Sequence, residues 1–322
     1  NAIGATRTME QYIAYILSIA GNTDTLAPCY GIVPSDDLTE WIAPDLKGFE
    51  GHGPVRIGNA AVEQVQHDAY GSVILAATPM FFDKRLPLPG DEGLFRLLEK
   101  MAGQCAALAL EPDAGIWEFR GRKRIHTHSG AMCWAGLSRT AAIAARLGFR
   151  DRAAHWQNLA ETIGVELLRR VWNEKRQAFA AAEGVDDMDA SVLLLPDLGL
   201  VEPHDPRFVS TVAAIEKDLV RGHHVMRYAA EDDFGLPETE FLVCRFWLID
   251  ALCVLGRKDE ARERFEDALA LRNSYGLLAE DIHPQTGALW GNFPQTYSMA
   301  GVILSAMRLS RSWEDRYWRA SS

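Results

Sequence analysis

The sequence predicts an all-α protein whose helical hairpins pack side by side as an α/α toroid. Three observations indicate this fold class. Apolar residues recur at the 3.6-residue spacing of helices in run after run, whereas alternating strand patterns are weak. Tight helix-to-helix junctions alternate with long connections. No window is Gly/Ser-rich, Pro-rich or of one charge sign, so we expect a single domain over residues 1–322.

The periodic runs set the expected helices. We expect them near 7–20, 59–78, 91–110, 129–147, 151–173, 206–220, 238–255, 258–271 and 295–310, with a shorter one near 187–195. No convincing βαβ unit accompanies them, which argues against a parallel sheet.

Two junctions between these helices resemble each other. Each ends one helix with Leu-Gly and opens the next with Asp and Ala after two or three linking residues. Gly148 and Gly256 suit the left-handed position after a helix end. Asp151 and Asp259 suit the next helix start, as cap or first-turn acid. Linkers this short predict antiparallel helical hairpins.

The other connections are long and rich in Gly, Pro, Trp and acidic residues. They cover 21–58, 79–90, 111–128, 221–237 and 272–294. Hairpins packed in a ring place their short turns on one face and their long loops on the other. Functional residues concentrate on loops that a rigid scaffold holds. We therefore expect the site on the long-loop face.

Charge argues against a nucleic-acid partner. The chain has 33 basic and 44 acidic residues, a formal net charge of −11. The densest basic cluster, Arg120, Arg122, Lys123 and Arg124, lies inside one loop and is typical of solvated loop charge. An acidic surface fits an enzyme that acts on neutral molecules. No apolar run reaches membrane-spanning length, so we expect no membrane partner either.

The cysteines indicate a reducing compartment. There are five at wide spacing, without a C-x-x-C pair: Cys29, Cys105, Cys133, Cys244 and Cys253. The last four lie in apolar helical patterns, where a free cysteine behaves as a small hydrophobic residue. Buried, reduced thiols predict a cytoplasmic location.

The loop "DAGIWEFRGRKRIHTHSG" is rich in large and charged side chains, which a simple turn between two helices does not require. Trp117 offers a flat apolar surface that can stack on a sugar ring or shield Glu118 from water. Shielding raises the pKa of a glutamate, as a general acid requires. The alternative is that Trp117 packs the loop and Glu118 pairs with Arg120.

Two further loops offer cationic candidates. "GFEGHGPVRIGN" holds Arg56 before a helix, but it lacks the glycine spacing of a phosphate cradle and is equally typical of a surface turn. "HHVMRYAAEDDF" holds Arg227, whose five donors suit hydroxyls or a carboxylate. A plain surface turn is the alternative there too.

The last long loop offers a second carboxylate. In "NSYGLLAEDIHPQTGALWGNFPQTYSMAG", Glu280 and Asp281 lie in an apolar frame before a Pro/Gly-rich turn, and Trp290 follows. A carboxylate in such a frame can activate water. The alternative is an acid pair at the end of a helix.

Other chemistries are poorly supported. His126, His128 and Cys133 lack a further ligand at regular spacing, so we expect no metal. Cys133 in "AMCWAG" is typical of a core helix rather than of a nucleophile paired with histidine. A G-x-S-x-G nucleophile motif is absent from the sequence. We expect no cofactor.

Five segments in order resemble glycoside hydrolase family 15, the bacterial glucoamylase, glucodextranase and trehalase-like group. They are "YGIVPSDDLTEWIAPDLKGFEGHGPVRIGNAAVEQVQHDAYG", "DAGIWEFR", "DDMDASVLLLPDLGLVEPHDPRF", "RYAAEDDF…ETEFLVCRFWLIDALCVLGRKDEA" and "GLLAEDIHPQTGALWGNFPQTYSMAG". The resemblance implies an (α/α)6 barrel and inverting, exo-acting hydrolysis of a terminal α-glucosyl bond in an α-glucan, an α-gluco-oligosaccharide or trehalose.

The resemblance also implies residue roles. Glu118 is the expected general acid and Glu280 the general base. Trp117 and Arg227 are expected to line the subsite for the non-reducing glucose. The other expected substrate-binding residues are Arg56, Arg120 and Trp290.

One family motif, an upstream Trp-Asp-Tyr-Arg-Tyr…Arg-Asp segment, does not occur in the sequence. Together with the abrupt start at Asn1, this predicts an N-terminal truncation of about one hairpin, with an upstream segment or β-sandwich domain of the same protein as a partner. Two alternatives stay open: a non-catalytic carbohydrate-binding or interaction toroid, and another α/α-toroid enzyme such as a sugar epimerase or phosphorylase.

Overall fold

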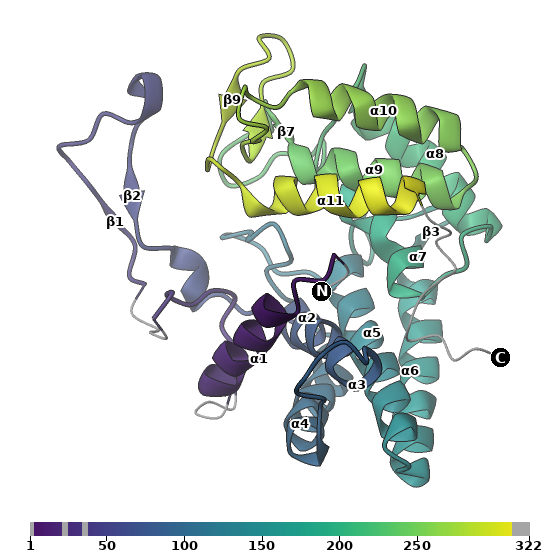
Figure 1. Cartoon of the computed structure of the whole chain (residues 1–322). Coiled ribbons are helices and arrows are strands. Elements are labelled where there is room, and N and C mark those ends of the chain that lie inside the picture. Colours follow the sequence, from purple (N-terminus) through teal and green to yellow (C-terminus); the bar gives the residue numbers. More distant parts are fainter. Residues whose placement is uncertain (1–2, 21–24, 34–37, 311–322) are drawn as a thin grey trace. The chain divides into compact units, whose positions relative to one another are not determined.

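The computed structural model describes residues 3–20, 25–33 and 38–310 (Figure 1). The chain divides into two compact units. Unit 1 comprises Asn1–Arg124 and Met132–Ile163, and unit 2 comprises Ile125–Ala131 and Gly164–Ser322. Helices dominate both units.

Unit 1 is built on the first helices. These are α1 (Thr6–Ala20), α2 (Asp68–Ala77), α3 (Pro79–Phe82), α4 (Glu92–Leu108), and parts of α5 (Thr127–Arg146) and α6 (Arg150–Val171). Their apolar faces meet in one core around the fully buried Ile74, Phe95, Leu98 and Leu137. The predicted helices at 7–20, 91–110, 129–147 and 151–173 are confirmed within one or two residues at most ends.

Glycines let α2 and α5 approach closely. A Cβ on Gly71 would lie 2.1 Å from the backbone oxygen of Met132, and one on Gly136 would lie 3.2 Å from the Cα of Gly71. Backbone cannot move away as a flexible side chain can. Gly71 of α2 and Gly136 of α5 therefore determine how closely these two helices pack.

Unit 2 is built around α9 (Leu242–Val254), whose residues are buried on nearly every face. It packs against both α10 (Lys258–Ala270) and α11 (Thr296–Ser310) (Figure 1). The remaining elements are the 3-10 turn η3 (Ala190–Leu194), α7 (Leu195–Leu198) and α8 (Pro206–Leu219). The predicted helices near 206–220, 258–271 and 295–310 are confirmed.

Both predicted tight junctions form as expected. Gly148 and Gly256 take φ of 84° and 81° after α5 and α9. The amide of each glycine, and that of the residue after it, donates to a carbonyl of the last helical turn. Asp151 and Asp259 lie in the first turns of α6 and α10. Glycine at the left-handed position thus ends each helix and reverses the chain.

Short antiparallel strands occupy the long connections. They are β1 (Trp41–Ile42) with β2 (Arg56–Ile57), β3 (Trp172–Asn173) with β4 (Ala178–Phe179), β5 (Val220–Arg221) with β6 (His224–Val225), and the sheet β7 (Glu240–Phe241), β8 (Asp281–Ile282) and β9 (Leu289–Trp290). Each strand is two residues long. Runs this short leave no alternating pattern in a sequence.

Three helix predictions were too long or of the wrong type. The one at 59–78 is a 3-10 turn, Ala60–Glu63, followed by extended chain before α2, because the Asn59 side chain caps the turn and Gln64 is extended. The one at 238–255 begins only at Leu242, because strand β7 comes first. The one near 187–195 is η3 followed by α7.

The prediction that the four cysteines in helical patterns are free and buried is confirmed. All five thiols are free, four of them are buried, and Cys29 is half-buried. Among the helices that the structure describes, none combines the length and the apolar character that a membrane span would need.

Candidate active site

In unit 1, Glu118 lies at the tip of a closed loop. Asp113 and Arg124 pair through two backbone hydrogen bonds of 2.9 and 3.0 Å, which close residues 113–124. Inside, the Glu118 amide donates to the Gly115 carbonyl at 3.1 Å. Glu118 has φ of 59°, in the left-handed region that L-residues other than glycine seldom adopt. Such strain persists only where the surroundings enforce it, and it concentrates at functional sites.

Buried hydrogen bonds anchor this loop to the segment before α2. The fully buried Asp113 carboxylate accepts from the His67 amide at 2.8 Å and from the Gly115 amide at 3.2 Å. Gln64 donates its side-chain amide to the Glu118 carbonyl at 3.0 Å. The backbone around Glu118 is therefore held from both sides.

The side chains of the loop divide by exposure. Glu118 is exposed and Trp117 is half-buried. Burial first and the Glu118 charge second raise the pKa of the nearby Cys29 thiol. The Arg122 guanidinium lies 4.0 Å from the centroid of the Phe119 ring, a cation–π contact. One member of the basic cluster Arg120–Arg124 is therefore packed on an aromatic side chain. A ligand can reach the Glu118 carboxylate. Its shielding by Trp117 stays a prediction.

The structure brings Arg56 and Arg120 together. Both face Glu40, a residue that the sequence gave no reason to select. Arg120 binds Glu40 with two hydrogen bonds of 3.1 and 2.9 Å, and Arg56 approaches it to 3.3 Å. The hydrogen bond from Arg120 is the main reason that the pKa of Glu40 is lowered. Arg120 follows Glu118 by two residues along the chain, and its guanidinium binds Glu40.

In unit 2, the Glu280 carboxylate is held by amide donors. It accepts from the Asn292 backbone and side-chain amides and from the Gln295 side chain, each at 3.1 Å. Leu242 donates its amide to the Glu280 carbonyl at 2.9 Å. A Cβ on Gly291 would lie 2.6 Å from Glu280 Oε2, so glycine leaves room for the carboxylate there. A carboxylate that accepts three hydrogen bonds is held in one orientation, as a base must be.

Asp281 lies beside Glu280 in a different environment. Burial raises the pKa of Asp281 to about 6, and the Thr239 hydroxyl, which donates to its Oδ2, and the charge of Arg227 work against this rise. Its Oδ1 is buried without a hydrogen-bond partner. A buried carboxyl with a raised pKa beside a proposed base is a pattern found at acid–base sites.

Arg227 is positioned by its neighbours on both sides. Its carbonyl accepts from the Ala190 amide at 2.9 Å, and Tyr228 forms a β-bridge with Asp189. Its Nη2 donates to Asp232 at 3.2 Å, and Asp232 also accepts from the Tyr228 hydroxyl at 2.6 Å. The Nε of Arg227 is buried without a partner. The guanidinium therefore keeps donor capacity for a ligand.

Register places Trp290 opposite Asp281. The two residues pair across β8 and β9, and Phe241 pairs with Asp281 from the other side. Glu280 and Trp290 were selected from one stretch of sequence and Arg227 from another. Unit 2 gathers Glu280 and Trp290 around one small sheet, and Arg227 acts electrostatically on Asp281 of the same sheet.

The histidines and cysteine weighed for metal or nucleophilic chemistry are buried at the start of α5. His126 and His128 are 7% and 6% exposed. The Cys133 thiol donates to the His67 carbonyl at 3.3 Å, and its pKa is raised well above the usual value by the Cys105 thiol and by burial. A thiol in this state is a core side chain rather than a nucleophile. In the described part of the chain, no three His, Cys, Asp or Glu residues gather in a way that suits a metal ion.

Comparison with known proteins settles the family. The sequence model of glycosyl hydrolases family 15 matches residues 15–307. The chain belongs to glycosyl hydrolases family 15. The match spans both the Glu118 loop of unit 1 and the Glu280 segment of unit 2, so the predicted family is confirmed.

Trehalases are among the relatives of this family-15 chain. A trehalase of Thermoplasma volcanium is 32% identical over 313 residues, and one of Mycobacterium tuberculosis is 33% identical over 320 residues. Each alignment covers 97% of this chain but 50% and 46% of the relative. The chain thus spans about half the length of these trehalases.

A solved structure has a similar fold. A bacterial glucoamylase in complex with acarbose matches with a TM-score of 0.60 at 16% identity, over 77% of this chain and 41% of that one. The predicted all-α fold class of family 15, the (α/α)6 barrel, is confirmed by this likeness and by the helices described above.

Proposed function

We propose that this family-15 chain carries the catalytic residues of an inverting, exo-acting α-glucoside hydrolase. Its substrates in this proposal are trehalose, α-glucans and α-gluco-oligosaccharides, from whose non-reducing end it releases glucose. Membership of glycosyl hydrolases family 15 and the two trehalases support the reaction class. Residues 1–322 would act as a catalytic domain of a cytoplasmic protein, a location that the five free thiols favour.

The proposed mechanism divides the work between two carboxyl groups. Glu118 donates its proton to the leaving glycosidic oxygen. Glu280 accepts a proton from a water molecule that attacks the anomeric carbon on the opposite face of the sugar. An inverting pair needs roughly 6.5–9.5 Å between the carboxyl groups to hold that water. The product is then the β-anomer of glucose.

The other site residues would bind the sugar. Arg227 retains a buried Nε without a hydrogen-bond partner, which suits a sugar hydroxyl. Trp117 and Trp290 offer apolar ring faces, the surfaces on which sugars stack. Arg56 and Arg120 would act as a pair, because Glu40 fixes both guanidinium groups.

One observation carries this proposal furthest. The three amide donors to Glu280, at 3.1 Å each, hold its carboxylate in one orientation and bring no positive charge to it. A helix-terminal acid pair, the alternative from sequence, would not need such a cradle. Asp281, with its pKa near 6, is a less suitable base because it binds a proton more tightly than an ordinary aspartate.

Two isosteric variants test the roles. Glu118→Gln and Glu280→Gln should each lower glucose release from trehalose and maltose about 1,000-fold or more, the range typical for losing a general acid or base. Glu183→Gln, which removes a surface carboxylate, is the control and should keep full activity. NMR of the first product should show β-glucose. Full activity in either site variant, or α-glucose as the nascent sugar, contradicts the proposal.

The same experiment separates catalysis from mere recognition. Calorimetry with maltose, isomaltose and trehalose measures binding independently of turnover. Binding without glucose release in the complete protein would favour a non-catalytic carbohydrate-binding toroid. Turnover that depends on phosphate would favour a phosphorylase.

A further inference from the structure

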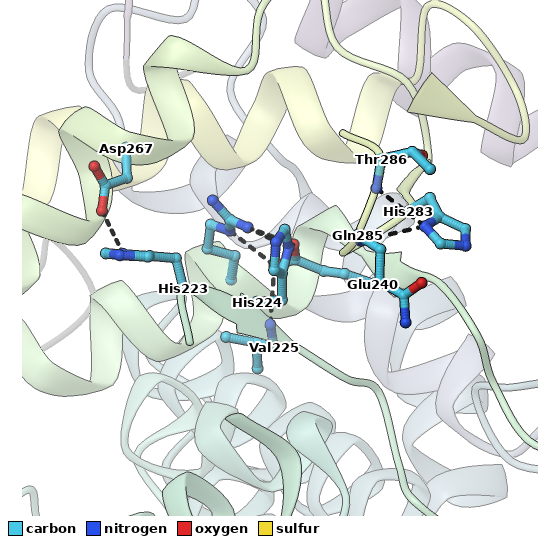
Figure 2. A network of polar contacts seen from close by, with 9 residues as sticks. His223, His224, Val225, Glu240, Asp267, His283, Gln285 and Thr286 are labelled. Carbon is cyan, nitrogen blue, oxygen red and sulfur yellow. Dashed lines mark hydrogen bonds and ion pairs between the residues drawn. The ribbon is translucent and has the colours of Figure 1, made fainter. Parts of the chain in front are cut away.

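A buried cluster of charged side chains lies beside the strand that precedes α9, and the proposed mechanism does not use it. Glu240 is 0% exposed and Arg245 is 2% exposed. Figure 2 shows His224 and Val225 turned toward Glu240. Burying a charged pair costs free energy unless hydrogen bonds compensate it, so the arrangement needs an explanation.

Every oxygen of the Glu240 carboxylate is saturated. Oε1 accepts from the Val225 amide at 3.0 Å and from Arg245 Nε at 2.7 Å. Oε2 accepts from Arg245 Nη2 and from His224 Nδ1, which is 2.7 Å away. Arg245 Nη2 also lies 3.0 Å from His224 Nδ1, so the guanidinium and the imidazole meet at this oxygen. The forked Arg245–Glu240 geometry is the strongest form of this contact.

The other histidines in the same view have separate partners. His223 contacts Asp267 at 2.6 Å, and His283 accepts from the amides that follow it in the turn after β8. The hydrogen-bonded cluster around Glu240 thus comprises Arg245, His224 and the Val225 backbone.

The Glu240 carboxylate joins two separate sheets. Val225 and His224 form β6, which pairs with β5, whereas Glu240 opens β7, which pairs with β8. The Val225 amide donates to the Glu240 side chain, so a side-chain bond connects the two sheets. Arg245, on the first turn of α9, fixes that side chain from below the strands.

Both sheets lead directly to proposed site residues. Arg227 follows Val225 by two residues. On the other side, Glu240 pairs in register with Ile282, and the Leu242 amide donates to the Glu280 carbonyl at 2.9 Å. A displacement of Glu240 therefore moves the segments of Arg227 and Glu280 relative to each other.

We propose that Glu240 is a positioning residue that holds Arg227 and Glu280 in register with each other. The proposal rests on the function proposed above for those two residues. Apolar side chains of similar size can often replace a buried ion pair without loss of stability. They cannot accept directional hydrogen bonds from β6 and α9 as the Glu240 carboxylate does, so positioning explains what packing alone does not.

Three variants test this role. Glu240→Gln keeps the size but loses the charge that Arg245 and His224 require. The double variant Glu240→Leu with Arg245→Met replaces the pair by apolar groups. Asp197→Asn is the matched control, because Asp197 also accepts a forked arginine, Arg308, at 2.7 and 2.8 Å, but that pair joins α7 to α11.

We expect Glu240→Gln to lower kcat/KM for trehalose or maltose about 100-fold, the cost typical of a displacement near 1 Å in a catalytic group. Amide hydrogen exchange should accelerate in both 224–228 and 280–282. The double variant should melt close to the unmodified protein and still lose activity. Asp197→Asn should keep kcat/KM within about threefold, because the ion pair that it weakens joins α7 to α11 and not the segments of Arg227 and Glu280.

The readouts distinguish this proposal from the proposed function. Exchange is measured whether or not the protein releases glucose, so an inactive parent protein leaves the positioning test intact. Faster exchange in only one of the two segments overturns the coupling. So does normal activity in a folded Glu240→Gln variant, or an activity loss that follows melting temperature equally in Glu240→Gln and Asp197→Asn.

Discussion

The two proposed catalytic carboxyls are held in opposite ways. Glu118 is fixed through its backbone: its φ of 59° sits in a turn that the buried Asp113 and the Gln64 side chain hold, while its own side chain is exposed. Glu280 is fixed through its side chain, whose carboxylate accepts three amide hydrogen bonds.

This difference matches the demands of the two proposed roles. A general acid must carry a proton and release it, so its carboxyl group gains little from a cradle of donors that favours the charged form. A general base must be aimed at one water, and such donors orient its carboxylate for that task. Damage to the backbone anchor should therefore affect the acid side, and damage to the side-chain cradle should affect the base side.

The largest effect on stability is expected from Asp113→Ala. It leaves the buried amides of His67 and Gly115 without acceptors, and losing a charged acceptor from buried donors costs about 3 kcal/mol. The free energy of unfolding, from urea titration, measures it. Asp91→Ala, which removes the cap of α4 where Asp91 accepts from Leu94 at 2.8 Å, is the control and should cost about 1 kcal/mol. Equal losses would show that Asp113 is no special anchor.

The largest effect on activity, short of removing a carboxyl, is expected from the cradle. Asn292→Ala combined with Gln295→Ala removes two of the three donors to Glu280. We expect kcat to fall about 100-fold with KM nearly unchanged, because preorganised hydrogen bonds act on the transition state. Gln64→Ala, which removes a backbone contact of Glu118, should change kcat less than about threefold. Steady-state kinetics compares them, and a larger effect of Gln64→Ala would reverse the contrast.

The sequence predicted the local features of this site and missed those that depend on distant residues. The helices and the two Gly-ended junctions were predictable because periodicity and left-handed glycine are local properties. Glu118 and Glu280 were selected by their loops and by family resemblance. Glu40 and the Glu240 cluster were missed, because a buried or paired acid has no local signature. Their partners, such as Arg120 for Glu40, lie up to 80 positions away.

The electrostatics of the base side predict a pH dependence. Asp281 has a folded-state pKa of about 6 against a usual 3.8. The folded state therefore binds the proton more tightly, and the stability from this group falls as pH rises from about 4 to 6. Asp281→Asn removes the penalty, so its stability advantage should grow over that range to about 3 kcal/mol at pH 7. Thermal unfolding at pH 4, 5, 6 and 7 measures it. An advantage independent of pH would contradict the raised pKa.

The smallest effect tests the backbone strain of the acid side. Glu118→Gly relieves the left-handed conformation, whereas Glu118→Gln keeps it, and both remove the acid. We expect the glycine variant to be more stable than the glutamine variant by about 1 kcal/mol, because the strain of an L-residue at this φ slightly exceeds the chain entropy of glycine. Gln177, with φ of 50° in the β3–β4 hairpin, provides the control. Gln177→Gly should give a similar gain without loss of activity. If only Gln177→Gly is stabilising, the turn at Glu118 is not strained, and its backbone anchor does not force the conformation.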